Sequence, residues 1–383
     1  YGEVGNDQIG GDRFLYLPSS YGAASDSGVN KYNFGLASNP YTSLMIVENK
    51  IGNPDLTWEK AKKMNVGVDI NLFNNCLTAS FDIFKEKRNN ILANRSTSPM
   101  IIGANLPAYN FGEMENRGWE MDLNFRHHIQ DFHYWARFNY SFARNEIIYM
   151  DEVQKRYDYQ MTTGRRKNQF FGLIFDGYYN SWEEINALDR PKSSWSGNQL
   201  QPGDVKYVDV NQDGVIDDYD MVPIGYTPVP EIIYGFSFGA QYKGFDFSIL
   251  FQGADNVSIK YFGRSMWPFA KGEESAKSLI KERWTQERYE AGEKITFPRL
   301  SLNPNGETDH NYRPSTLWIR DASYLRLKNL EVGYTFTGGF VKRLNLNSVR
   351  LYFNGSNLFT WTDVVDLDPE APSRSGNVEI NTY

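Results

Sequence analysis

The sequence predicts an all-β protein, a portion of a large antiparallel transmembrane β-barrel with long structured extracellular loops. Three observations predict this fold class. Apolar and polar residues alternate along segments of about ten residues, as in strands with two different faces. The apolar phase is rich in Tyr, Phe and Trp, which gather at membrane interfaces, and the polar phase is rich in Asn, Ser, Gly, Asp and Arg. Short turns and very long loops alternate along the chain, so that every long loop lies at the same end of the strands.

Four hairpins are expected in chain order. Their residues are 57–92, 119–148, 232–253, and 324–336 with 348–359. The first three turn at Asn74-Asn75, at Gln130-Asp131 and at Lys243-Gly244, while the last has a longer turn with one helical turn around residues 340–344. Residues 1–56, rich in Gly, Ser, Asn and Tyr, are expected to be the end of one strand followed by a long loop.

The long loops are expected at about 93–118, 151–231 and 254–323, longer than loops of compact soluble domains usually are. Two of them carry helix signals. Ser181 precedes Glu184 by three residues, the spacing of a capping box, so a short helix is expected to start at Ser181. Apolar residues at helical spacing predict an amphipathic helix over 273–291.

Composition narrows the function classes. A formal net charge of −7 over 383 residues, without a basic stretch, argues against nucleic-acid binding. No run approaches the roughly 18 uninterrupted apolar residues of a membrane helix. Cys76 is the one cysteine, so no internal disulfide can form, and it is interpreted as a small packing residue. A soluble β-sandwich, such as a secreted or surface β-rich glycan-binding domain with a structural calcium loop, is the alternative; its outward strand faces should be polar.

One motif has the spacing of a calcium loop. Residues 209–220 read DVNQDGVIDDYD, which fits D-x-N-x-D-G with an acid at the twelfth position. The proposed ligands are Asp209, Asn211 and Asp213 by side chain, Val215 by its carbonyl, Asp217 through a water, and Asp220. Aspartate in place of the usual glutamate at position twelve, and the extended flanks, indicate a structural Ca²⁺ rather than a switch. The alternative is an acidic loop of Asx-turns that binds nothing.

No other constellation indicates catalysis, so the chain is not expected to be an enzyme. His127, His128 and His133 cluster around one short turn, and adjacent His127 and His128 point to opposite faces of a strand, so these two cannot share a metal ion. Neither a phosphate-binding glycine loop nor a nucleophile elbow nor H-E-x-x-H occurs.

Five stretches resemble TonB-dependent outer-membrane receptors of the SusC/RagA type. They are 51–60 (IGNPDLTWEK), 116–120 (NRGWE), 203–207 (GDVKY) leading into the acidic loop, 318–330 (WIRDASYLRLKNL) and 354–360 (NGSNLFT). The resemblance implies that residues 1–383 are the C-terminal part of a barrel of about 22 strands, without its N-terminal plug, and that they belong to a longer protein in the bacterial outer membrane. It also implies TonB-dependent import of an oligosaccharide or oligopeptide, with a SusD-like surface lipoprotein as lid and the TonB–ExbB–ExbD complex as energy source.

Within that resemblance, the long loops are expected to form the extracellular mouth and the strands to contact outer-membrane lipid. Flat aromatic side chains suit stacking on sugar rings and contacts with peptides. The candidates for contact with ligand or lid are Tyr178, Tyr179, Trp182, Trp195 and Trp267. For each of them, packing inside the loops is the competing interpretation.

Overall fold

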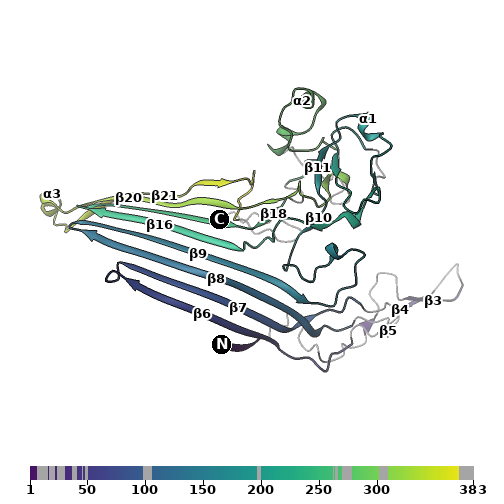
Figure 1. The fold of residues 1–383 in the computed structure, drawn as a ribbon, viewed down its shortest axis with the longest axis horizontal. Coiled ribbons are helices and arrows are strands. Elements are labelled where there is room, and N and C mark those ends of the chain that lie inside the picture. Colours follow the sequence, from purple (N-terminus) through teal and green to yellow (C-terminus); the bar gives the residue numbers. More distant parts are fainter. Residues whose placement is uncertain are drawn as a thin grey trace.

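The computed structural model describes residues 1–6, 16, 22–23, 31–36, 41–44, 46–47, 51–97, 106–195, 200–261, 263, 266–269, 278–301 and 309–370. Its main feature is one sheet of nine strands in the order β1-β6-β7-β8-β9-β16-β17-β20-β21. The bounds are β1 Gly2–Asn6, β6 Glu59–Leu72, β7 Leu77–Ala93, β8 Tyr109–Ile129, β9 Phe132–Tyr149, β16 Ile232–Tyr242, β17 Phe245–Asp255, β20 Tyr324–Phe336 and β21 Val349–Thr362. All neighbours pair antiparallel, so the predicted all-β barrel strands are confirmed (Figure 1).

The tight turns lie at one end of the sheet. Asn74, Asn75, Gln130 and Lys243 all adopt positive φ, as the tightest hairpin turns require. Asn and Gly tolerate this conformation, which explains why Asn74-Asn75 and Gly244 mark two of these turns in the sequence. The last turn contains α3 (Gly339–Arg343), the expected helical turn.

Strand β8 begins at Tyr109, inside the first loop expected from the sequence. The added part alternates too, but with charges instead of apolar residues. Lys85 pairs with Glu115 at 2.8 Å and Lys87 with Glu113 at 3.0 Å across the β7–β8 ladder. Hydrophobic periodicity therefore detects only the part of the strand that meets lipid, and these strands continue beyond it.

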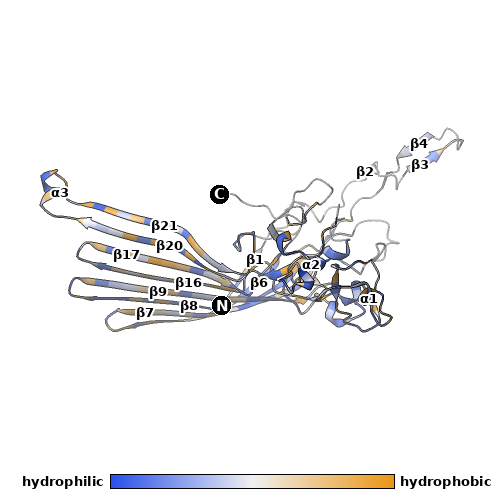
Figure 2. Cartoon of the chain, turned by 90° about the horizontal axis from the view of Figure 1, so that it is seen from above, coloured by the Kyte–Doolittle hydropathy of each residue, from blue (hydrophilic) through white to orange (hydrophobic). Residues whose placement is uncertain are grey.

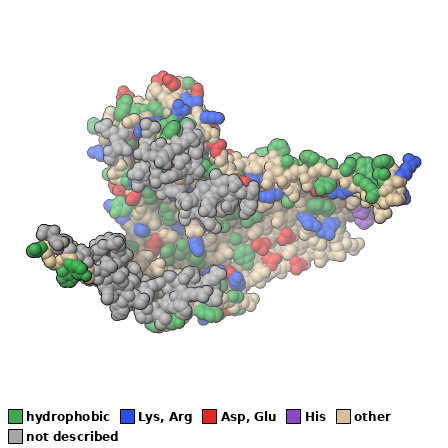
Figure 3. All heavy atoms as spheres, turned by 180° about the vertical axis from the view of Figure 1, so that it is seen from behind, with side chains coloured by type: hydrophobic (Ala, Val, Ile, Leu, Met, Phe, Trp, Pro, Cys, Tyr) green, Lys and Arg blue, Asp and Glu red, His purple; other side chains and the backbone are tan. Residues whose placement is uncertain are grey.

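The sheet has an apolar outer face and a polar inner face, visible as alternating colours along the strands in Figure 2. Large apolar side chains of the outer face are exposed, for example Val66, Phe236 and Phe353. On β9 the outer apolar residues extend from Phe142 to Phe132. Ten residues span ~34 Å along a strand, or ~26 Å across a bilayer at a tilt of about 40°, close to the apolar band of outer-membrane barrels. In Figure 3, the face of the sheet in view carries charged side chains along its strands, and hydrophobic side chains gather near the end of the sheet that carries α3.

The long loops fold into a second body, here called the cap, at the end of the sheet opposite the tight turns (Figure 1). Its short elements are β10 Phe171–Gly172, β11 Phe175–Tyr178, α1 Trp182–Ile185, β12 Lys192–Ser193, β13 Val205–Tyr207, β14 Val215–Ile216, β15 Val222–Pro223, β18 Ser258–Lys260, α2 Gln286–Glu290 and β19 Ile319–Asp321, with 3₁₀ turns at Asp158–Gln160, Asp218–Asp220, Ser278–Glu282 and His310–Tyr312. Strand β2 (Gly22–Ala23) pairs with β5 (Ile46–Val47). Strand β3 (Lys31–Phe34) pairs with β4 (Tyr41–Leu44).

The two helix predictions in the loops had different outcomes. Helix α1 starts at Ser181 as predicted, and the Ser181 side chain accepts a hydrogen bond from the Glu184 amide. The continuous helix over 273–291 is wrong for its described part, which is a 3₁₀ turn and the short helix α2 separated by Arg283, Trp284 and Thr285. The Trp284 amide donates to the Phe297 carbonyl, and the Thr285 side chain caps α2, so the chain leaves the helical path there. No helix among the described residues is long and apolar enough to cross a membrane.

Candidate functional site: the cap and the sheet beneath it

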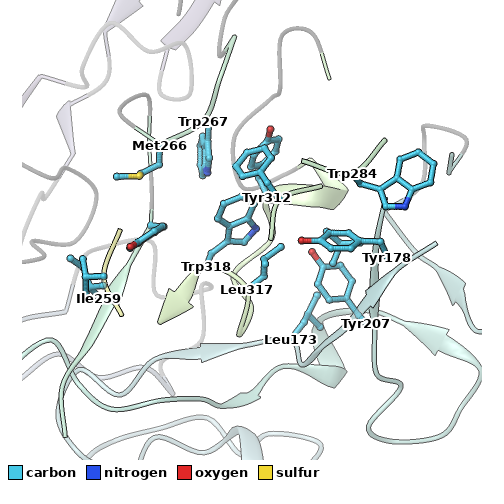
Figure 4. Close-up of a cluster of buried hydrophobic side chains, with 14 of the residues drawn as sticks. Leu173, Tyr178, Tyr207, Ile259, Met266, Trp267, Trp284, Tyr312, Leu317 and Trp318 are labelled. Atoms are coloured by element: carbon cyan, nitrogen blue, oxygen red, sulfur yellow. The ribbon is translucent and has the colours of Figure 1, made fainter. Parts of the chain in front are cut away.

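An aromatic core holds the cap together (Figure 4). Trp318 stacks on Tyr312 at 5.3 Å between ring centroids and meets Phe297 edge-on at 5.5 Å. Its indole N–H donates to the Asn311 carbonyl at 2.8 Å. Further buried members come from the two longest loops and include Leu173, Val205, Tyr261, Met266 and Trp267. The loops thus form one packed unit with its own core.

Buried polar contacts connect the same loops. The Asp204 carboxylate pairs with Arg299 at 2.6 Å and accepts hydrogen bonds from the Asn311 side chain at 2.8 Å and the Gln201 amide at 2.7 Å. His310 lies nearby with its Nε2 atom 2.8 Å from the Val205 carbonyl. Burial lowers the pKa of His310 below its ordinary value, outweighing the Val205 carbonyl and the carboxylates of Asp204 and Asp309, which raise it.

An ion cluster lies where the cap joins the sheet. Strand β9 extends beyond β16, and the gap is filled by the nearly buried Glu231. Its carboxylate accepts two hydrogen bonds from Arg144, at 3.0 and 2.8 Å, and pairs also with Arg166. Burial alone raises the pKa of Glu231, but the two guanidinium groups outweigh it and hold the pKa below its usual value. This cluster separates the inner and outer faces of the wall at that level.

Two hollows lie on the inner face beside this cluster. One, of about 400 Å³, is mostly apolar and is lined by Ile233, Gln252, Ala254, Val257, Tyr324, Lys328, Glu370 and residues 228–230. The other, of about 340 Å³, has charged and amide side chains in its lining, including Glu86, Arg88, Asn116, Asn145 and Lys167. Both touch Val229 and Pro230, so the two hollows are neighbours. Their side-by-side position offers an apolar and a charged subsite to one elongated ligand.

The side-chain oxygens of the acidic loop accept hydrogen bonds from the loop's own amides. Asp209 Oδ2 accepts from Gly214 at 2.8 Å, Asn211 Oδ1 from Asp213 at 3.0 Å, and Asp213 Oδ1 from Val215 at 2.9 Å. Asp220 accepts from Val210 and Asp217, each at 2.8 Å, and Asp217 caps the 3₁₀ turn at Asp218–Asp220.

Two features of this loop fit a cation. Asp209 Oδ1 is buried without a hydrogen-bond partner. Burial and the nearby Asp209 carboxylate raise the pKa of the fully buried Asp220, although three backbone amides lower it. Still, no three His, Cys, Asp or Glu side chains of the described residues converge closely enough to hold a metal ion. Binding would therefore require the carboxylates to turn away from the loop amides.

The five aromatic candidates occupy different environments. Tyr178, Tyr179 and Trp267 are buried, and burial raises the pKa of the Tyr178 phenol far above its ordinary value. Trp195 packs at the margin of the core with Arg313 at 4.0 Å over its ring. Only Trp182 among the five is well exposed, at 53 %. The contacts of the other four are packing contacts, and a role in ligand or lid binding stays a prediction for all five.

Several residues of the hollows were missed in the sequence. Glu231, Asn145 and Lys167 belong to no motif, and Lys328 lies in the 318–330 stretch but has no predicted role there; each is an ordinary polar residue near a strand end. The signal available was position: each lies near the cap end of a strand, where the loops of a barrel meet the lumen.

Antiparallel strands with a lipid-sized outer apolar band, joined by loops that pack into a cap, define the chain as part of an outer-membrane-type β-barrel. The family model "TonB dependent receptor-like, beta-barrel" matches residues 18–358, and the chain belongs to this family of outer-membrane receptors.

Individual relatives agree. The chain is 27 % identical over 384 residues to a TonB-dependent receptor of Formosa agariphila, covering 95 % of this chain and 37 % of the relative. It is 26 % identical over 389 residues to TonB-dependent receptor SusC of Bacteroides thetaiotaomicron, covering 100 % of this chain and 35 % of SusC. The solved structure of the RagAB peptide importer in the "open-open" state matches its fold with a TM-score of 0.64 at 22 % identity, covering 97 % of this chain and 37 % of that one. The chain thus spans little more than a third of these proteins' length, and the expected SusC/RagA-type resemblance is confirmed.

Proposed function

We propose that the protein containing this chain imports an oligosaccharide or oligopeptide across the bacterial outer membrane, energised by TonB–ExbB–ExbD. The observation that carries the proposal is the pair of hollows on the inner face next to the cap junction. A ligand passing between cap and lumen meets an apolar surface at Ile233 and Ala254 and charged groups at Lys328 and Lys167. The chain's membership of a family of transporters supports the proposed import function. The secreted β-domain alternative conflicts with the exposed apolar outer face.

We further propose that a SusD-like surface lipoprotein docks on the cap. The cap is rigid enough to be a docking platform because it has its own core. Its surface also exposes Trp182, Leu188 and Tyr289, side chains of the kind that protein interfaces bury. Of the five aromatic candidates, Trp182 is therefore the one assigned to lid or ligand contact.

The test of import uses the full-length protein in its own outer membrane. Extraction in mild detergent followed by mass spectrometry should find a co-purifying lipoprotein and a bound oligosaccharide or oligopeptide. In cells, Lys328→Ala should reduce uptake of that ligand roughly tenfold or more, since a charge-assisted hydrogen bond is lost. Lys342→Ala, in α3 at the opposite end of the sheet, is the matched control. Uptake that persists without TonB would point to a passive pore instead.

A structural Ca²⁺ in the acidic loop is the second part of the proposal. Asp209, Asn211, Asp213, Asp220 and the Val215 carbonyl would hold the ion, with Asp217 acting through water, and the ion would supply the positive charge that the buried Asp209 oxygen lacks. Calcium should raise the melting temperature of the full-length protein relative to EGTA, and Asp213→Asn should remove most of the difference. Asp218→Asn, at an exposed neighbour that pairs with Arg313 at 3.7 Å, is the control. Equal melting temperatures with calcium and EGTA would leave the loop as a hydrogen-bonded turn.

A further inference from the structure

A third hollow, of about 400 Å³, lies on the other side of the Glu231 cluster and is distinct from the proposed ligand path. It is lined by Arg117, Arg144, Arg165, Arg166, Glu146, Asn145, Gly164, Gln169, Pro223 and Gly225. Four arginines and one glutamate line it, and the carboxylates of Glu231 and Glu115, from outside the lining, pair with three of these arginines. The lining itself therefore carries more guanidinium groups than carboxylates.

Strand register places this hollow on the outer face. Arg117 pairs with Arg144 in the β8–β9 ladder, and the next outer-face pair is Trp119 with Phe142. Side chains two residues apart lie on the same face of a strand. Trp119 also stacks on Tyr140 at 4.7 Å, and the Arg144 guanidinium lies over the Phe142 ring at 5.4 Å. Arg117 and Arg144 therefore share the face that carries the apolar band, and Arg165 and Arg166 line the same hollow beside them.

The hollow also lies at a defined height. Trp119 and Phe142 form the uppermost apolar row of that band on β8 and β9, and the arginine row follows ~7 Å further along the strands. That is the level at which an aromatic girdle ends and lipid headgroups begin. The outer face at this level meets the outer leaflet, because the cap end of the sheet is the extracellular one.

The four arginines differ in the ion pairs that they form. Arg144 and Arg166 share Glu231. Among the described residues, the Arg117 guanidinium has two long ion-pair contacts, to Glu115 at 4.0 Å and to Glu146 at 3.8 Å. The half-buried Arg165 is held by its backbone, whose carbonyl accepts from the Ile147 amide at 2.8 Å, and no ion pair of its guanidinium is found among the described residues. Two guanidinium groups are thus positioned on the outer side with donors to spare, and guanidinium forks match phosphate oxygens.

We propose that this arginine hollow binds the phosphate-bearing headgroup of an outer-leaflet lipid, whose acyl chains lie on the apolar band below. The occupant follows from the juxtaposition of an unbalanced guanidinium cluster with lipid-facing aromatic side chains on one face and at one height. The lipid would secure the wall at the Glu231 cluster, where β9 extends beyond its neighbour. This proposal goes beyond import and does not depend on the substrate.

The test compares lipid retention in full-length protein extracted from the outer membrane. Native mass spectrometry should detect a phosphate-bearing lipid on the unmodified protein, and Arg117→Ala/Arg165→Ala should reduce its occupancy by about tenfold or more. Arg117→Lys/Arg165→Lys keeps the charge but not the fork and should fall in between. Lys167→Ala, which removes one charge at a similar height from the inner hollow, should retain the lipid. Equal retention in all variants would overturn the proposal.

A second measurement separates a lipid from a free anion. Delipidated protein in phosphatidylcholine nanodiscs should gain thermal stability when phosphatidic acid is added, and the double alanine variant should not. Inorganic phosphate added to the protein in neutral detergent should have little effect. Stabilisation by inorganic phosphate equal to that by phosphatidic acid would show a simple anion site and overturn the lipid assignment.

Discussion

The strand sheet and the cap use the same aromatic residues in opposite ways. Phe353 of β21 is 65 % exposed, whereas Phe297 of the cap is 1 % exposed. In the cap, aromatic rings are buried against one another, as in the interior of a soluble domain. In the sheet, they point outward, where the surrounding lipid takes the place of a core. The comparison teaches that burial within the chain identifies the core of the cap but not the stabilising apolar surface of the sheet.

The largest expected difference between the sheet and the cap follows from removing the side chain at the centre of the cap core. Trp318→Ala should destabilise the cap by roughly 3–5 kcal/mol, because a large cavity opens and the Asn311 carbonyl loses its donor. Limited proteolysis should then cut the cap loops, while the strands stay resistant and keep their heat-dependent electrophoretic mobility. The exposed Trp182→Ala should leave both unchanged. Proteolytic cleavage of the strands together with the cap loops would show that the sheet and the cap do not unfold independently.

A charge in the apolar band tests the sheet in the same way. Phe236→Arg, near the middle of β16 on the outer face, should cost roughly 2–4 kcal/mol in a bilayer. Ser237→Arg places the same charge at the next residue, whose side chain lies on the inner face of the sheet, and should cost much less. Unfolding by urea in lipid vesicles measures the difference. Equal costs would contradict the assignment of the two faces.

The junction between the regions is tested through Glu231. Glu231→Gln should cost about 2 kcal/mol at neutral pH, because hydrogen bonds to two charged guanidinium groups are weakened. Since the folded-state pKa of Glu231 lies below its usual value, its stabilisation is present above the ordinary glutamate pKa and is lost as the pH falls through the lowered one. Thermal unfolding against pH should therefore show a flatter acid limb in the variant. An unchanged acid limb would mean that protonation of Glu231 does not cause the loss of stability at low pH.

The smallest expected effect concerns a single helix end in the cap. Ser181→Ala removes the hydrogen bond to the Glu184 amide and should destabilise the cap by about 1 kcal/mol. Ser181→Asp keeps an acceptor at this position and should restore the lost stability. Hydrogen exchange at the Glu184 amide reports the change locally, and faster exchange in both variants would contradict the capping role.

Sequence reasoning was successful where structure is determined locally. The turns at Asn74-Asn75 and Lys243-Gly244 were found because positive φ requires particular residues within a few positions of each other. The upper part of β8 was missed because its outer face carries Glu113 and Glu115 rather than apolar residues. Local pattern alone also failed at 273–291, where the pairing of Trp284 with Phe297 overrides helical spacing.

The hollows and the cap core could not be predicted in the same way, because they join distant residues. The Phe175 amide donates to the Thr316 hydroxyl across 141 positions, and Asp204 meets Arg299 and Asn311 across about a hundred. Nothing in the neighbourhood of these residues in sequence indicates their partners. The acidic loop is the exception among the candidate sites, since its twelve consecutive residues contain the whole motif.

The meandering strand order has a consequence for the time course of folding. Each hairpin turns on its own few residues, so little loop-closure entropy is lost within it, and each hairpin pairs with the strand just before it, so the sheet can grow in the order of the chain. The cap cannot form in this way. Its core needs Leu173 and Trp318 together, so it has to wait until β16, β17 and their connecting loop have been placed. The cap is therefore expected to form last, after the strands beneath it have paired.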